Sequence, residues 1–399
     1  MNELSLSLLA HGPDVVNTLR PFLDRFEAKN GVHVEANMFE WETAWSELVK
    51  VALYGHGPDV SEMGSTWVGS LIAMNAFQTF DVRELAAHGG AVAFVPSAWQ
   101  SAIEVGSGET WALPWLAYAR LIYYRRDLLE QAGVDERAAF QTHEQLEQTL
   151  SRLAAKGMAA PWAVPTRNSR DTLHNIASWV WSAGGEFVSA DGKHMLFNDK
   201  PARAGIRAYF DLHRYLVPAA RQMNESDSLF RQGRAAVIMS GPWLWPVDVS
   251  RPSNIAPQVA ANIGVAVPLD VSFVGYSYLV IWRHSRRRDV ALKLVRELTG
   301  AEVLAAYAPS TGPLFVRLDM LDHSPLANEP NGQVMARAIK TGRTFPSISL
   351  WGLIEDKLAA ALDNIWEDVL DEAHPDMDAI MNKHLDPLAH RLETTLAGV

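Results

Sequence analysis

Aromatic and polar side chains that could bind a ligand gather in one stretch, residues 112–134, which reads ALPWLAYARLIYYRRDLLEQAGV. Trp115 and Tyr118 offer flat apolar faces, and Arg120 offers hydrogen-bond donors. Pro114 cannot donate a hydrogen bond to a sheet, so we expect the backbone to leave its sheet there and to cross from one lobe into another. Clefts between lobes commonly bind small molecules, and this stretch is therefore predicted to contact a ligand.

The chain contains 14 Trp, an unusual number for a core, and several fall at predicted loop ends. An abundance of such flat rings suits a site that stacks on a ligand. Trp41 follows a predicted strand, Trp67 follows Ser65 and Thr66, and Trp243 lies in the motif GPWLW. Ordinary packing in the core is the alternative for each ring. Further candidates for contact with a ligand are His11, Asp14, Gly275, Tyr276 and Trp351.

Sequence signals for catalysis are weak. The chain has no phosphate-binding loop, no HExxH zinc motif and no GxSxG nucleophile motif. Its 13 His are scattered, and His384 and His390 lack the spacing of metal ligands. We therefore expect no catalytic residue, no metal and no cofactor. Glu62 and Asp248 lie near aromatic residues and leave one alternative open, the carboxylate pair of a glycoside-cleaving enzyme.

Strand and helix patterns alternate in the first part of the chain. Residues 4–8 alternate apolar and polar side chains, as in a strand with one buried face, and apolar residues then recur at helical spacing up to Gly31. Further strands are predicted from residue 32 and from Asp59. This order favours a largely parallel sheet covered by helices, with its ligand at the carboxyl ends of the strands. The loops expected on that rim are those around Gly12, Trp41 and Ser65.

Length, charge and composition restrict the function further. A chain of 399 residues is too long for one core, which makes two domains the default. Its formal charge is 35 − 46 = −11, which argues against nucleic acid and anionic membrane surfaces as partners. The absence of Cys excludes disulfides and thiolate chemistry. The apolar runs are strand-sized, which excludes a transmembrane helix. No signal peptide is visible, so we expect either that the protein is cytosolic or that a leader has been removed from it.

Five stretches follow one another in an order that resembles a known family. They are GPDVSEMGSTW (57–67), the crossing stretch (112–134), WVWSAGGEF with the DGK and FN that follow it (179–198), LFRQGRAAVIMSGPWLW (229–245), and VPL followed by GYS (267–277). This chain resembles the extracellular solute-binding proteins of ABC importers, in the carbohydrate branch that includes maltose-binding protein. The resemblance covers nearly the whole chain, and the crossing stretch and the GPW stretch are specific.

The resemblance implies a two-lobe α/β fold of the periplasmic-binding-protein class II type. Each lobe is expected to hold a mostly parallel sheet flanked by helices, with hinge strands between the lobes. Residues 1–116 and 275–314 are expected in the N-terminal lobe, and residues 117–274 and 315–399 in the C-terminal lobe. The implied function is capture of a sugar by hinge closure and its delivery to the permease subunits of an ABC transporter. The protein is then expected to be monomeric, not an enzyme, and periplasmic or extracellular and membrane-tethered, with its leader absent.

The family's contacts can be carried onto matching positions. Trp243 stands where the family stacks an aromatic ring on a pyranose, and Tyr118 stands at a sugar-contacting position of the crossing stretch, with Arg120 two residues on. Tyr118 stands where some members of the family have a carboxylate, so the resemblance does not imply which sugar this chain binds. The remaining matches are Ser65 and Thr66 beside Trp67, and His174 and Asn175 ahead of the Gly-Gly pair.

Two other functions remain open at this stage. One is the glycoside-active enzyme on a two-domain scaffold. The other is a receptor of the same fold for a different ligand, such as a glycerophosphodiester or a polyamine. A phosphate would require several converging basic groups, and the sequence places only Arg120 and Arg343 near the expected site.

Overall fold

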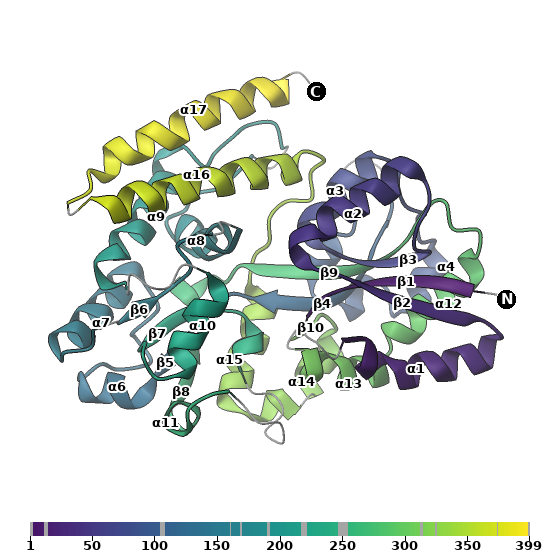
Figure 1. The fold of residues 1–399 in the computed structure, drawn as a ribbon, viewed down its shortest axis with the longest axis horizontal. Coiled ribbons are helices and arrows are strands. Elements are labelled where there is room, and N and C mark those ends of the chain that lie inside the picture. Colours follow the sequence, from purple (N-terminus) through teal and green to yellow (C-terminus); the bar gives the residue numbers. More distant parts are fainter. Residues whose placement is uncertain are drawn as a thin grey trace.

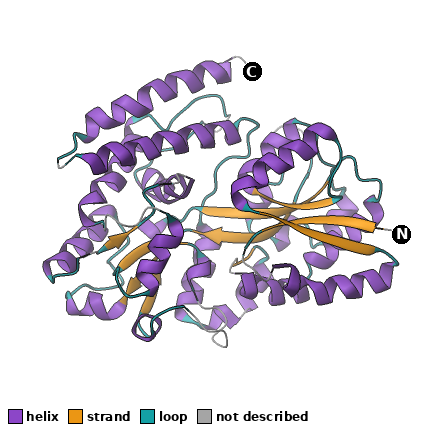
Figure 2. Ribbon diagram, in the orientation of Figure 1, coloured by secondary structure: helices purple, strands orange, loops and turns teal. Residues whose placement is uncertain are grey.

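A computed structural model describes residues 3–11, 15–103, 108–159, 161–167, 170–189, 192–216, 222–245, 254–311, 314–323, 325–372 and 374–397. Its strands form two separate sheets, and helices surround both of them (Figures 1 and 2). The predicted α/β class and two-lobe organisation are therefore observed. The part of the chain built on the larger sheet is called the first lobe below, and the part built on the smaller sheet the second lobe.

The first lobe is built on a six-stranded sheet with the order β10-β4-β9-β3-β1-β2. Side chains in β1 alternate as the sequence predicts, because Leu4, Leu6 and Leu8 are fully buried. The first three strands pair in parallel, whereas β9 runs antiparallel to both β3 and β4. The strands are β1 (Glu3–Leu9), β2 (His33–Phe39), β3 (Val60–Gly64), β4 (Leu113–Ala119), β9 (Val274–Ile281) and β10 (Leu314–Phe315).

Helices of the first lobe cover this sheet. In the first of them, Val15, Leu19 and Leu23 recur at helical spacing and are buried together. The second ends at Gly55, whose φ of 65° allows the left-handed turn that closes a helix. The helices are α1 (Val15–Asn30), α2 (Trp41–Tyr54), α3 (Ser65–Ala73), α4 (Val82–Ala87), α5 (Pro96–Gln100), α12 (Arg288–Leu298) and α13 (Ala301–Thr311), with the 3-10 turn η1 (Ala91–Ala93).

The second lobe is built on a four-stranded sheet with the order β6-β7-β5-β8. Its strands are β5 (Leu121–Arg125), β6 (Trp162–Ala163), β7 (Val237–Ser240) and β8 (Ile263–Ala266). Helices in this part of the chain are α6 (Arg126–Gln131), α7 (His143–Ala155), α8 (Arg170–Ser182), α9 (Lys200–Phe210), α10 (Met223–Arg231) and α11 (Pro257–Ala260), with the 3-10 turns η2 (Asp211–Tyr215), η3 (Pro242–Leu244) and η4 (Pro268–Asp270).

The end of the chain is helical. After α14 (Leu318–His323), η5 (Pro325–Asn328) and α15 (Pro330–Thr341), two long antiparallel helices follow, α16 (Trp351–Asp371) and α17 (Met377–Ala397) (Figure 1). Met335 and Ile339 of α15 belong to a core cluster that includes residues of both sheets, whereas Trp366 of α16 belongs to a second cluster, which also contains Ile122 and Tyr124 of β5. The lobe boundaries 116/117 and 314/315 stay a prediction.

Strand pairing corrects the expectation of mostly parallel sheets. In the second sheet β5 runs antiparallel to both β7 and β8, and only β6 and β7 pair in parallel. The reason is the long strands that cross between the lobes. Each of these strands reaches its sheet from the other lobe. No helical crossover joins it to the strand beside it, so the two strands need not run parallel.

The chain passes between the lobes at three points, and hydrogen bonds join these segments. Arg120 N donates to Phe273 O (2.8 Å), and Ser272 Oγ donates to Arg120 O (2.6 Å). Arg343 N donates to Ser272 O (2.9 Å), and Val274 N donates to Arg343 O (2.7 Å). Pro114 is not the crossing point, because β4 continues to Ala119 and accommodates the proline at a shift in pairing register between Pro114 and Leu116.

Buried His88 makes stability depend on pH. It follows α4, and its Nδ1 lies 3.0 Å from Oγ1 of Thr299 at the end of α12. Burial, and secondarily the nearby Arg296 and Arg317, lowers the pKa of His88 to about 4. The imidazole pKa in an unfolded chain is about 6.5, so the unfolded state binds this proton first as pH falls.

We expect the free energy of unfolding to fall by roughly 2 kcal/mol between pH 6.5 and pH 4 because of His88. Urea denaturation at pH 7, 5 and 4 measures this fall in the wild type and in His88→Gln, which cannot titrate. The free energy of unfolding should fall less in His88→Gln than in the wild type, and the difference should equal the contribution of His88. An identical pH dependence in the two proteins would contradict the assignment.

Candidate functional site

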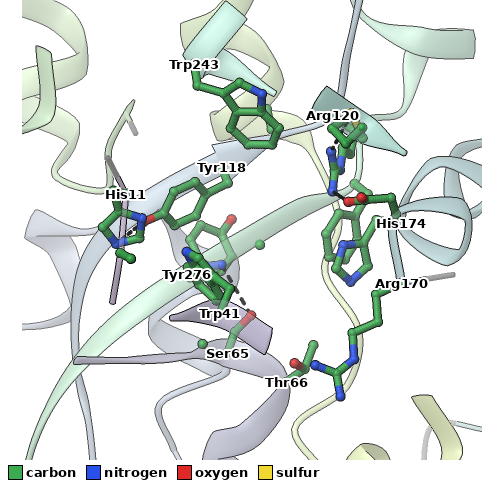
Figure 3. Close-up of a pocket in the computed structure, with 17 residues that line it drawn as sticks. His11, Trp41, Ser65, Thr66, Tyr118, Arg120, Arg170, His174, Trp243 and Tyr276 are labelled. Atoms are coloured by element: carbon green, nitrogen blue, oxygen red, sulfur yellow. Dashed lines mark hydrogen bonds and ion pairs between the residues drawn. The ribbon is translucent and has the colours of Figure 1, made fainter. Parts of the chain in front are cut away.

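One cavity of about 460 Å³ lies where elements of the two lobes meet (Figure 3). Figure 3 shows Trp243 and Tyr118 extending into this pocket, with His11 on one side and Arg120 and His174 on the other. Its described lining consists of Ala10, His11, Trp41, Gly64, Ser65, Thr66, Tyr118, Ala119, Arg120, Arg170, Asp171, His174, Met223, Trp243, Phe273, Gly275 and Tyr276. Ten of the residues proposed from the sequence therefore line one pocket.

The first lobe contributes residues that follow the carboxyl ends of its parallel strands. His11 comes after β1, Trp41 begins α2 after β2, and Ser65 and Thr66 begin α3 directly after β3. Parallel strands end at one edge of a sheet, which is why these residues meet. No side chain caps α3 at Gly64, so the helix presents its amino end without a side-chain acceptor. Gly12 and Asp14, also predicted on this rim, lie outside the described residues.

A buried carboxylate orients the polar groups beside Trp41. Glu62 Oε2 accepts from Leu9 N (2.9 Å), and Glu62 Oε1 lies 2.7 Å from His11 Nε2. The Tyr118 hydroxyl lies 3.0 Å from the same nitrogen of His11. Burial, and secondarily the nearby Glu62, raises the pKa of Tyr118 well above its usual range, so its hydroxyl stays protonated at neutral pH.

The second lobe contributes the amino-terminal turn of α8 and the residue at the first crossing. Arg120 Nη2 donates to Asp171 Oδ1 at 2.5 Å, and the Arg120 guanidinium lies 5.3 Å from the ring centre of Trp243. His174 stacks on Phe273 with ring centres 4.4 Å apart, and its Nε2 lies 3.2 Å from Glu355 Oε1. Burial lowers the pKa of His174 although Glu355 opposes the shift, which favours a neutral ring at pH 7.

Trp243 is held in place from behind. Its Nε1 donates to Asp227 Oδ2 at 2.8 Å, and Ser240 Oγ donates to Asp227 Oδ1 at 2.7 Å. Asp227 is buried on α10, and this burial raises its pKa, while the two hydrogen bonds oppose the shift. Gly241 lies against the ring so closely that a Cβ there would be 2.0 Å from Cζ3 of Trp243. The indole is thus fixed as one wall of the pocket.

Four residues predicted in the site do not line the pocket. Trp67 is 3% exposed and packs behind Trp41, with ring centres 5.7 Å apart. Trp115 is fully buried, stacks on Tyr307 and donates through Nε1 to Leu298 O (3.0 Å). The other two are Asn175, buried on the inner face of α8, and Trp351, which stacks on Phe345 at the start of α16.

Strand and helix geometry explains these corrections. Trp115 lies at the shift in pairing register of β4 and its ring stacks on Tyr307, whereas Tyr118 lies beyond the shift and lines the pocket. On a helix, His174 and Asn175 are turned about 100° from one another, and only the first reaches the pocket. Gly275 and Tyr276 do line the pocket, but the Tyr276 hydroxyl points away to Ser97 Oγ (2.7 Å).

Sequence reasoning missed several lining residues and one supporting residue. The missed lining residues that carry hydrogen-bonding groups are Arg170 and Asp171, one helical turn before His174, so a search at i−3 and i−4 of that candidate would have found them. Met223 and Phe273 carry no recognisable signal. Asp227 is 16 residues from Trp243 in the chain, and only the packing of α10 on β7 brings the two together.

The pocket combines apolar ring faces with donors and acceptors at its edge. Trp41, Tyr118 and Trp243 supply the rings, and Arg120 and Asp171 supply a donor and an acceptor side by side. A small ligand with both C–H-rich faces and polar groups would find partners for both.

Comparisons with known proteins agree with this architecture. Residues 12–305 match the family model described as bacterial extracellular solute-binding protein. The chain is 21% identical to the diacetylchitobiose binding protein DasA of Streptomyces coelicolor over 83% of this chain and 77% of that protein.

Solved structures show the same fold. A solute-binding protein of an ABC transporter from Thermotoga lettingae, bound with alpha-D-tagatose, is 21% identical with a TM-score of 0.82, covering 98% of this chain and 99% of that one. The maltose-bound MalE3 of T. maritima is 19% identical with a TM-score of 0.81, covering 99% of this chain and 100% of that one. The matched family model spans well over half of the chain, which therefore belongs to the bacterial extracellular solute-binding protein family.

Proposed function

We propose that this protein is the sugar-binding receptor of an ABC importer, which captures its ligand in the pocket between the lobes and delivers it to the membrane permease. The carrying observation is a pocket walled by Trp41, Tyr118 and Trp243 at the point where the chain crosses between the lobes. Hydrogen-bonded crossing segments suit hinge closure, since a few backbone torsions there can move one lobe against the other. The names of DasA and of the tagatose- and maltose-bound neighbours, all sugar binders, support the proposal.

The receptor is proposed to release its ligand unchanged. Glu62, one of the two carboxylates of the glycosidase alternative, is fully buried and bonded to His11 and Leu9, which keeps this carboxylate out of reach of a substrate. Asp248 lies outside the described residues. Incubation with chromogenic glycosides distinguishes the two functions, because a receptor should show no turnover and an enzyme should.

The proposal extends to location and partners. A receptor of this family works outside the cytoplasmic membrane, so we infer a periplasmic or extracellular, membrane-tethered monomer that docks on permease subunits. None of the described helices has the length and apolarity that would let it cross a bilayer.

Sugar binding is the decisive measurement. Calorimetric titration with glucose, galactose, tagatose, maltose, maltotriose and diacetylchitobiose should give saturable heat with at least one of them. A ligand at about 100 times its Kd should stabilise the folded protein by about 2.7 kcal/mol and raise Tm by several degrees. No heat and no thermal shift with any sugar would overturn the proposed function.

A further inference from the structure

Two arginines line the pocket, and at first sight they suggest an anionic ligand. Each is already paired with a carboxylate of the protein. Arg120 Nη2 donates to Asp171 Oδ1 at 2.5 Å, and Arg170 Nη2 donates to Asp356 Oδ1 at 2.6 Å. The positive charge of both guanidinium groups is therefore balanced before a ligand arrives.

Histidines in the lining follow the same pattern. His11 lies 2.7 Å from Glu62, and His174 lies 3.2 Å from Glu355. Both glutamate side chains are almost completely buried, with exposed fractions of 0% and 2%. Within the described lining, every side chain that can carry a positive charge thus has its own carboxylate. An incoming carboxylate or phosphate would lose its hydration without meeting an unpaired positive charge.

Hydrogen-bonding capacity remains in the pair of Arg120 and Asp171. The Arg120 side chain is only 9% exposed, and its Nη1 has the sulfur of Met223, at 4.0 Å, as its partner. Asp171 uses Oδ1 for Arg120, and its side chain is 25% exposed and lines the pocket. The pair therefore presents an unused donor and a carboxylate acceptor next to one another. Two adjacent hydroxyl groups match this pattern, because one can accept from the guanidinium while the other donates to the carboxylate.

We propose that the pocket selects an uncharged sugar over the corresponding sugar acid or sugar phosphate, and that the pair of Arg120 and Asp171 holds two adjacent hydroxyl groups of this sugar beside Trp243. The inference rests on the proposed function and adds the charge class of the ligand. It also separates this receptor from one for a glycerophosphodiester.

A matched pair of ligands tests the charge selection. The probes are the tightest-binding sugar of the calorimetric panel and the uronate that carries a carboxylate at C6 of the same sugar, titrated at 50 and 500 mM NaCl. We expect the uronate to bind at least 100-fold more weakly at both salt concentrations. A uronate that binds as tightly as the neutral sugar, or more tightly, would overturn this inference and leave the sugar receptor standing. Absence of binding by every sugar would instead overturn the proposed function.

Replacing Asp171 tests the role of the pair. Asp171→Asn removes the acceptor charge and leaves Arg120 unpaired, so affinity for the neutral sugar should fall about tenfold and the ratio of neutral to uronate affinity should shrink at least tenfold. A purely structural role of Asp171 would weaken both ligands alike and leave the ratio unchanged, which would contradict the assignment.

A control substitution of the same kind is available on the surface. Asp378 pairs with Arg207 between α17 and α9 at 2.6 Å, with both side chains about half exposed or more. Asp378→Asn should change neither affinity nor the ratio. Should Asp171→Asn fail to fold, the wild-type ratio alone decides the question of charge.

Discussion

Replacing Gly241 with alanine is expected to weaken sugar binding by about 10- to 100-fold, as much as Trp243→Ala. The backbone at Gly241 has a φ of −99°, which alanine adopts without strain, so the effect comes from contact alone. The new methyl group would lie 2.0 Å from Cζ3 and 2.1 Å from Cη2 of Trp243. Two carbon atoms that are not bonded to one another cannot lie this close, so the indole must leave its position. Its hydrogen bond from Nε1 to Asp227 Oδ2 is then lost.

A double-mutant cycle isolates this effect. In a Trp243→Ala background the methyl group at position 241 meets no ring, so Gly241→Ala should then change neither the sugar affinity nor the free energy of unfolding appreciably. Calorimetry and urea denaturation on the four proteins measure both quantities. Full sugar affinity in the single variant Gly241→Ala would mean that Trp243 does not form the binding wall in its present position.

This dependence on Gly241 and Asp227 shows where sequence reasoning stops. The GPW stretch pointed to Trp243 because the resemblance to the family implies a stacking aromatic ring at that position. Nothing local points to Asp227, whose role arises when α10 packs on β7. Motifs identify a candidate, whereas the residues that hold it in place depend on long-range packing.

Aromatic candidates failed where the sequence pattern did not specify a face. Trp115 shares the crossing stretch with Tyr118, but it lies at the shift in pairing register of β4 and its ring stacks on Tyr307 in the core. Trp351 begins helix α16, and its ring stacks on Phe345 and does not line the pocket. Trp115 was expected beyond the end of its strand and instead lies within β4, and in both cases neighbours in space decide the direction of the ring.

The crossing itself was predicted within a few residues, and the error has a physical cause. Proline was expected to end the strand at position 114, but the absence of an N–H is tolerated where the pairing register shifts. The chain therefore reaches Arg120 before it changes lobes, and this places the arginine at the junction of all three crossing segments. A side chain at this junction can contact elements of both lobes, which is consistent with its position in the binding pocket.

Glu62→Ala is expected to lower the free energy of unfolding by about 3 kcal/mol. The carboxylate is fully buried and accepts from Leu9 N at 2.9 Å, while His11 Nε2 lies 2.7 Å away. Alanine would leave both groups buried without a partner, and it would open a cavity beneath β1 and β3. Urea denaturation at pH 7 measures the loss, and Glu302→Ala, which removes an exposed ion pair with Arg25, should leave the free energy of unfolding nearly unchanged.

The isosteric variant separates hydrogen bonding from charge at this position. Glu62→Gln keeps an amide oxygen that can accept from Leu9 N, but its NH2 group cannot accept from His11. We therefore expect it to recover part of the stability lost in Glu62→Ala, and we expect lower sugar affinity than in the wild type because His11, which contacts the Tyr118 hydroxyl, loses its acceptor. A glutamine variant with wild-type affinity would show that the orientation of His11 does not matter for binding. An alanine variant as stable as the wild type would show that water satisfies the two groups that Glu62 binds here.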